Sequence, residues 1–292
     1  MSAITTTAGP GARSPRPHDG QQVGAETSDG GRMTGIGLAI PADSTDDHFV
    51  AALVNALAEP LIAEGYGLFT RVVHDSAAER RMYRLWAASD GIAGVVLLGA
   101  GRTDERVKLL RSLGVPFAAV ADVSQQGDFP AVLVDAAASV DVISGFLAAG
   151  RHGRTVYLAA PGDSVTSQAR ANAVGDRFEI VRVERDAAAA VAAAAAIIAT
   201  GPATLLFDSD VHAAAAASAF ISRGLKVPDD VAIVSWTDSA LCRSATPSLT
   251  AVDRRGGEIG RLLGHLMLAT IAGGEARADR APDPFIVRRE SA

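Results

Sequence analysis

Short apolar runs alternate along the chain with longer segments in which apolar and polar positions recur at helical spacing. The short runs are continuously apolar, which is typical of parallel strands covered by helices on both faces. We expect strands at residues 36–41, 68–73, 94–99, 116–121, 131–135, 155–160, 178–184, 203–208 and 231–236. We expect helices at residues 49–67, 76–89, 104–114, 137–149, 166–174, 187–198 and 211–223. This order predicts an α/β fold with two parallel sheets, and therefore two lobes.

Glycines mark the ends of four helical segments. Gly65, Gly114, Gly150 and Gly224 each follow the last residue of an apolar, helix-like pattern, as expected of a residue just past a helix C-terminus. The alanine block 187–196 has the composition of a low-complexity segment. Because alanine is the strongest helix former and two isoleucines follow directly, the block predicts a packed helix with close neighbours.

Composition narrows the class of protein. Of the 292 residues, 48% are hydrophobic and 21% charged, which is enough for a packed interior. The net charge of −6 argues against a chain that grips nucleic acid by itself, since that needs a concentrated basic face. The single cysteine, Cys242, excludes an internal disulfide and a multi-thiolate metal site. No apolar run is long enough to span a membrane without charges or breaks.

Residues 1–34 differ from the rest of the chain. They are rich in Gly, Ser, Thr and Pro and have no periodic apolar face, so we expect a disordered tail. The segment lacks the basic start and apolar core of a secretory signal. A cytoplasmic location is therefore expected.

Several passages together resemble a known family. GLKVPDDVAIVSWTDSALCRSATPSLTAV (224–252) is similar to the pattern G-x-x-V-P-x-D-V-x-V-V-G-F-D-D followed by P-P-L-T-T-V, which is diagnostic of LacI/GalR-type transcription regulators. VLVDAAASVDVISGFLAAGRHGRTVYLAAP (132–161), the opening IGLAIP (36–41) and the ending FIVRRESA (285–292) also resemble that family. The resemblance covers residues 35–292 and implies the ligand-sensing part of such a regulator, with the type I periplasmic-binding-protein fold.

The resemblance also implies the division of the chain. Three crossings between the lobes are expected, with an N-terminal lobe of residues 35–148 plus 250–275 and a C-terminal lobe of residues 149–249 plus 276–292. A helix-turn-helix headpiece precedes the sensor in the family, whereas here a Gly- and Pro-rich tail precedes the first strand. The expectation is therefore a sensor whose DNA-binding headpiece is absent from this chain, and DNA is a partner only if a headpiece is supplied elsewhere.

Ligands of such folds bind outside the carboxyl ends of the strands, where loops and helix N-termini converge. After the first strand, one interpretation is that Asp46 or Asp47 caps the following helix, and the other is that His48 or Phe49 faces the cleft. Asp135 ends another strand and either caps the next helix or faces the ligand.

The C-terminal lobe supplies further candidates. Arg170 in SQARANAV matches the family's S-x-x-R, and a guanidinium there suits paired hydroxyls or a carboxylate, although a solvated surface arginine is the alternative. Ser209 matches a position that often meets the ligand. In SWTDS, Trp236 takes the family's aromatic place, Thr237 replaces its first aspartate and Asp238 corresponds to its second. Because the first aspartate binds a sugar hydroxyl, Thr237 weakens the case for ordinary sugar recognition, while Asp238 is either a ligand contact or structural.

Catalysis is not expected. The six histidines are scattered without metal-binding spacing, and neither a G-x-S-x-G elbow nor a Walker-type loop occurs. We therefore expect no enzyme activity, no catalytic residues, no metal and no cofactor.

The function that these observations imply is ligand-dependent regulation. A small polar metabolite, sugar-like in character, is expected to bridge the lobes of a homodimer that contacts no membrane. Two alternatives remain open: a sugar-binding protein of a transport system, and a cytoplasmic sensor that acts through a protein partner.

Overall fold

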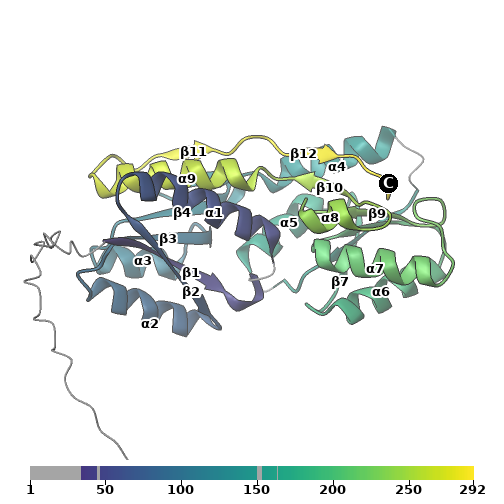
Figure 1. The fold of residues 1–292 in the computed structure, drawn as a ribbon, viewed down its shortest axis with the longest axis horizontal. Coiled ribbons are helices and arrows are strands. Elements are labelled where there is room, and N and C mark those ends of the chain that lie inside the picture. Colours follow the sequence, from purple (N-terminus) through teal and green to yellow (C-terminus); the bar gives the residue numbers. More distant parts are fainter. Residues whose placement is uncertain (1–33, 45–46, 150–152, 163) are drawn as a thin grey trace, which may run out of the picture. The chain divides into compact units, whose positions relative to one another are not determined.

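The computed structural model describes residues 34–44, 47–149, 153–162 and 164–292. The expected tail, Asp46 and the helix-ending Gly150 lie outside the described residues. Within them the chain forms two six-stranded sheets with helices on both faces (Figure 1). The α/β prediction with two parallel sheets is therefore confirmed.

The first sheet has the strand order β11-β5-β4-β3-β1-β2, and every adjacent pair in it is parallel. Its strands are β1 (Gly35–Pro41), β2 (Gly67–Val73), β3 (Ile92–Ala100), β4 (Phe117–Asp122), β5 (Ala131–Val134) and β11 (Ala278–Arg280). Helices α1 (His48–Ala63) and α9 (Gly256–Ile271) cover one face, and α2 (Ser76–Ala87) and α3 (Glu105–Ser112) cover the other. Alternate residues of the strands enter the two apolar clusters, as expected for strands buried on both faces.

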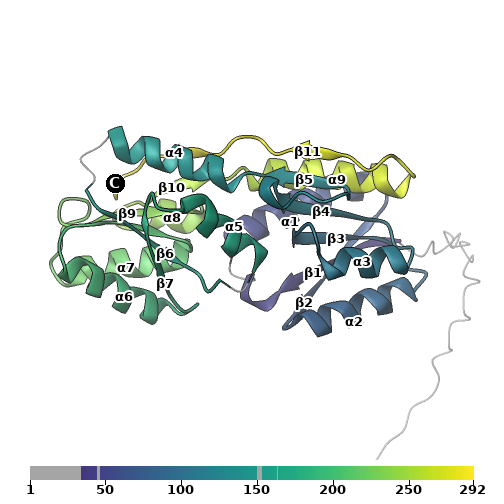
Figure 2. The ribbon, with the colours of Figure 1, turned by 180° about the vertical axis from the view of Figure 1, so that it is seen from behind.

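The second sheet has the order β12-β10-β9-β8-β6-β7, in which β12 alone runs antiparallel to its neighbour. Its strands are β6 (Thr155–Ala159), β7 (Glu179–Arg182), β8 (Thr204–Phe207), β9 (Ala232–Ser235), β10 (Thr250–Asp253) and β12 (Phe285–Val287). Helices α4 (Ala136–Ala149) and α5 (Val165–Val174) lie on one face (Figure 2). On the other lie α6 (Ala187–Ala199), α7 (Asp210–Ser222) and α8 (Ala240–Ser244). Two 3₁₀ turns follow strands of the first sheet, at Ala42–Ser44 and Val123–Gln125.

The chain passes between the sheets three times, after β5, after β10 and after β11 (Figure 1). The segments fall differently from the expected lobe boundaries. Strand β10 pairs with β9 of the second sheet, α4 packs on that sheet, and β11 pairs with β5 of the first. Hydrogen bonding places β10 and β11, and packing places α4; the few residues of each strand do not by themselves specify a sheet.

The predicted alanine-rich helix is present as α6, with Ala190, Ala194 and Ile197 buried against the second sheet. The expected helix-ending glycines Gly65, Gly114 and Gly224 have positive φ, between 66° and 82°, a conformation that glycine adopts at low cost.

Helices α1 and α9 lie side by side over the first sheet (Figure 1). Gly260 on α9 faces α1 so closely that a Cβ atom there would lie 2.3 Å from the Leu53 carbonyl oxygen. Gly264, one turn further, would place a Cβ 2.4 Å from Pro60 Cγ. The two glycines therefore allow backbone contact between α1 and α9.

Candidate functional site

A cavity of about 810 Å³ lies between the two sheets. It is lined by residues at or just beyond the carboxyl ends of strands from both sheets, together with the N-terminal parts of α1, α5 and α7. Strand ends at Pro41, Leu98, Val120 and Val134 come from the first sheet. This is the position at which open α/β sheets bind ligands.

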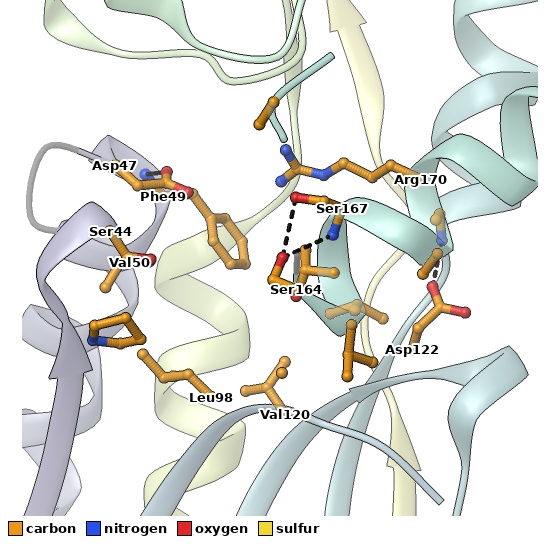
Figure 3. A pocket seen from close by; sticks show the side chains of 18 of the residues that line it. Ser44, Asp47, Phe49, Val50, Leu98, Val120, Asp122, Ser164, Ser167 and Arg170 are labelled. Carbon is orange, nitrogen blue, oxygen red and sulfur yellow. Dashed lines mark hydrogen bonds between the residues drawn. The ribbon is translucent and has the colours of Figure 1, made fainter. Parts of the chain in front are cut away.

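Arg170 lies on α5 and reaches into the cavity from the second sheet's side. Its side chain is 9% exposed and its Nη1 donates to Asp208 Oδ1 at 2.5 Å. Its guanidinium carbon lies 5.4 Å from the centroid of the Trp236 ring, a cation–π arrangement. Figure 3 shows Arg170 and Ser167 on one side of the cavity, with Asp47 and Phe49 on the other. The surface-arginine alternative for Arg170 is therefore wrong.

Asp208 follows β8 and is the counter-charge of Arg170. Its Oδ1 also accepts a hydrogen bond of 2.6 Å from the Tyr157 hydroxyl. Burial raises the pKa of the Asp208 carboxyl, but Arg170 and the Tyr157 hydroxyl outweigh it and hold that pKa below its ordinary value. Burial and the Asp208 carboxylate raise the pKa of Tyr157 well above its usual range. Tyr157 is therefore a neutral donor to an ionised carboxylate.

Arg254 follows β10 and is another guanidinium that lines the cavity. Its side chain is 13% exposed, its Nη2 donates to Thr237 Oγ1 at 2.8 Å, and Asp47 Oδ1 lies 3.6 Å from Nη2. The guanidinium stacks over the Phe49 ring at 3.9 Å from its centroid. Burial and the nearby charge of Arg170 lower the pKa of Arg254 to about 10.

Six of the eight residues expected in the cleft line this cavity: Phe49, Asp135, Arg170, Ser209, Trp236 and Thr237. Two of the open alternatives are resolved in part. Asp47 caps α1 by accepting from the Phe49 amide at 2.9 Å. Asp135 lines the cavity and also accepts from the Ala138 amide in the first turn of α4 at 3.0 Å. Ser209 stands at the N-cap of α7, but its side chain does not cap the helix.

The other two expected residues, His48 and Asp238, line a smaller neighbouring cavity of about 290 Å³. The side chain of His48 is 43% exposed, and its Nδ1 lies 2.7 Å from Asp210 Oδ2 on α7, so the contact joins elements of the two sheets. Asp238 holds both terminal nitrogens of Arg289, at 2.7 and 3.0 Å, and accepts from the Ser239 amide. The structural alternative for Asp238 is thus the one that its contacts favour.

Arg254 and Asp208 line the cavity and were not among the residues expected there, nor was Tyr157, which lies behind Asp208. Arg254 and Asp208 each stand directly after a strand, so the rule used for Asp135 applied to them as well. Tyr157 lies within a strand, and no sequence signal distinguishes it from a core aromatic residue.

Among the described residues, no group of three or more His, Cys, Asp or Glu side chains is placed to hold a metal ion. In the same part of the chain, no helix is both long and apolar enough to cross a membrane. The cavity offers hydrogen-bond donors, carboxylates and aromatic faces, which suit a small polar ligand.

A family model described as a periplasmic binding protein-like domain matches residues 145–292. An uncharacterised HTH-type transcriptional regulator in the aml 5′ region of Streptomyces limosus is 28% identical over 237 residues, which are 74% of this chain and 66% of that protein. The chain therefore spans slightly less than two thirds of the length of that relative.

Solved structures share the fold. A LacI family transcriptional regulator from Bifidobacterium animalis subsp. lactis superimposes with a TM-score of 0.79 and 27% identity, over 88% of this chain and 97% of that one. A complex of the transcriptional regulator CelR with cellobiose gives a TM-score of 0.76 and 22% identity, over 88% of this chain and 84% of that one. The similarity extends across both sheets.

Proposed function

The chain belongs to the periplasmic binding protein-like domain family, and on that premise we propose that it is the effector-sensing part of a LacI-type transcription regulator. In this proposal a small polar, sugar-like metabolite binds between two lobes, each formed by one sheet and its helices. The HTH-type relative and the LacI family structure support the regulatory role. DNA contact belongs to a headpiece outside the sensing part.

The observation that carries the proposal is the cavity at the carboxyl ends of both sheets. Its volume of about 810 Å³ lies within the range of about 300–1,000 Å³ that small-molecule sites occupy. Trp236 and Phe49 contribute aromatic rings to the lining, while Arg170, Asp135 and Ser209 contribute polar atoms. The cellobiose bound by CelR supports a sugar-like ligand for a cavity of this kind.

Binding between the lobes provides the means of regulation. A ligand shifts a conformational equilibrium only when it binds one state more tightly than the other. A molecule held by Phe49 and Asp135 on one side and Arg170 and Trp236 on the other favours the state in which the two sheets are close. The His48–Asp210 contact of 2.7 Å joins α1 to α7 and changes when that separation changes. Lobe closure is then transmitted to the rest of the regulator.

A thermal-shift screen of the purified chain against sugars, sugar acids, polyols and nucleosides tests the proposal. A ligand at about 100 times its dissociation constant stabilises the folded protein by about 2.7 kcal/mol, which gives a clear shift. A cooperative melt that no compound in the panel moves would contradict the proposed function.

A hit from the screen is then assigned to the cavity by mutation. Arg170→Lys keeps a positive charge beside Asp208 but loses the planar fork, so affinity should fall about tenfold, since a charge-assisted hydrogen bond contributes about 1.5–3 kcal/mol. Arg177→Lys is the matched control, because Arg177 pairs with Asp141 on the surface of the same lobe. Equal affinities of the two variants would place the ligand elsewhere.

A further inference from the structure

We propose that the effector is an acidic sugar-like molecule, whose carboxylate lies between the guanidinium groups of Arg170 and Arg254. This inference rests on the proposed function, because it takes the cavity between the sheets as the effector site. It goes further by assigning the charge of the ligand and naming Arg254 as the residue that selects it.

Arg254 is a buried cation with little compensation from the protein. Its Nη2 donates to a neutral hydroxyl, that of Thr237. Among the described residues its Nε has no hydrogen-bond partner, although the atom is buried. The nearest carboxylate, Asp47, lies 3.6 Å away, and the Oδ1 atom that faces Arg254 already accepts from the Phe49 amide. A buried charge in this state calls for an external counter-ion.

Arg170 is also positively charged, so it increases the unbalanced positive charge around Arg254. It shares the carboxylate of Asp208 with the hydroxyl of Tyr157, and its positive charge opposes that of Arg254. One of its terminal nitrogens bonds to Asp208, which leaves other N–H groups of the planar fork directed at the cavity (Figure 3). A guanidinium fork is well matched to the two oxygens of a carboxylate.

Four acids that line the cavity bind protein donors. Glu79 and Asp104 both bind Arg106, at 3.0 and 2.8 Å. Asp122 and Asp135 accept from amides at the start of α4, at 2.9 and 3.0 Å. These four carboxylates therefore interact with protein donors, and His48 Nδ1 lies 2.7 Å from Oδ2 of Asp210, another buried acid of the lining. Arg170 and Arg254 by contrast retain N–H groups without a protein acceptor among the described residues. A ligand carboxylate supplies the charge that this arrangement lacks.

Isothermal titration with matched pairs of neutral and acidic sugars tests the inference. The pairs are D-glucose with D-glucuronate, D-galactose with D-galacturonate, and cellobiose with cellobionate. In at least one pair the acid should bind about tenfold or more tighter than its neutral partner, as expected of a charged hydrogen bond. The advantage should shrink between about 50 mM and about 500 mM NaCl.

Two variants locate the effect. Arg254→Gln keeps a donor near Thr237 without the charge, so it should bring the acid to within about threefold of its neutral partner. Arg261→Gln removes an arginine of α9 that pairs with Glu59 on the surface, and should leave the preference unchanged. Acids that bind no tighter than their neutral partners in any of the three pairs, or an acid preference that survives Arg254→Gln, would overturn the inference.

Inorganic phosphate separates this inference from the proposed function. If none of the sugars or sugar acids binds, the proposed sugar-like effector is what fails. Phosphate should still raise the melting temperature of the unmodified chain more than that of Arg254→Gln, with Arg261→Gln behaving like the unmodified chain. Equal rises in all three proteins would show that Arg170 and Arg254 do not form an anion site.

Discussion

Replacing Arg254 by glutamine should stabilise the ligand-free protein, although the change removes a buried side chain's contacts. The reason is that the folded state holds the Arg254 charge away from water and close to Arg170, which lowers its pKa to about 10. A base whose pKa falls on folding destabilises the folded state wherever it is protonated in both states. At neutral pH, Arg254 is in that condition.

The magnitude follows from the size of the pKa change. At about 1.4 kcal/mol per pKa unit, the difference from the ordinary arginine value corresponds to a penalty of about 3 kcal/mol. Glutamine forfeits the stacking of the guanidinium on Phe49, worth about 0.5–2 kcal/mol, and weakens the bond to Thr237 by about 1 kcal/mol. A net gain of about 1 kcal/mol remains, which raises the melting temperature by about 2–4 °C for a domain of this size.

Urea denaturation followed by circular dichroism measures the free energy of unfolding at neutral pH for the unmodified chain and for Arg254→Gln. The penalty is fully present below the folded-state pKa and is relieved as pH rises through about 10 toward the unfolded value, so the gap between the two proteins should narrow there. The exposed-face control Arg261→Gln should change stability by no more than about 0.5 kcal/mol. Destabilisation by Arg254→Gln of more than about 1 kcal/mol would refute the reasoning, because it would mean that the folded chain already compensates this charge.

Asp208→Asn should cost about 3–5 kcal/mol at neutral pH, because it leaves Arg170 buried without its counter-charge. The lowered pKa of Asp208 makes this contribution present above the ordinary aspartate pKa and lost as pH falls through the folded value, so the cost measured in urea should shrink in acid. Gly260→Ala should destabilise the folded protein by about 1–3 kcal/mol, because its Cβ would clash with α1. Gly257→Ala has open space at its Cβ and should be neutral or stabilising. Equal effects of the two substitutions would contradict the close packing of α1 and α9. In the expected homodimer, the exposed edge strand β2 is a candidate for pairing two copies of the chain. Val72→Glu should then convert a dimer into a monomer, which light scattering measures. An unmodified chain that is monomeric at micromolar concentration would contradict this pairing.

The positions of strands and helices could be predicted from the sequence where the signal is local. Continuous apolar runs such as 94–99 and 203–208 are buried on both faces in the structure, and the glycines at 65, 114 and 224 end helices as expected. The membership of Thr250–Asp253 could not be predicted from its own residues. Its four-residue pattern suits either sheet, and pairing with β9 decides the matter.

The cavity residues likewise divide into those placed by local geometry and those whose role depends on residues distant in sequence. Phe49, Asp135 and Trp236 could be found because each stands just after a strand or at a helix start, which places it by local geometry. The role of Asp238 depends on Arg289, which the antiparallel pairing of β12 with β10 brings beside it. Because Arg289 is distant in sequence, the role of Asp238 could not be predicted from its own position in the sequence.

The uncompensated positive charge of Arg254 follows from the residue type at position 237. The family pattern that this chain resembles has an aspartate where Thr237 stands, and Thr237 Oγ1 lies 2.8 Å from Arg254 Nη2. A carboxylate at that distance would pair with the guanidinium and leave the site nearly neutral, suited to a ligand that offers hydroxyls. Threonine satisfies one N–H group but supplies no charge, so the positive charge of Arg254 remains for the ligand. On the proposed assignment, threonine in place of the family's aspartate makes the cavity favour an acidic ligand over a neutral one.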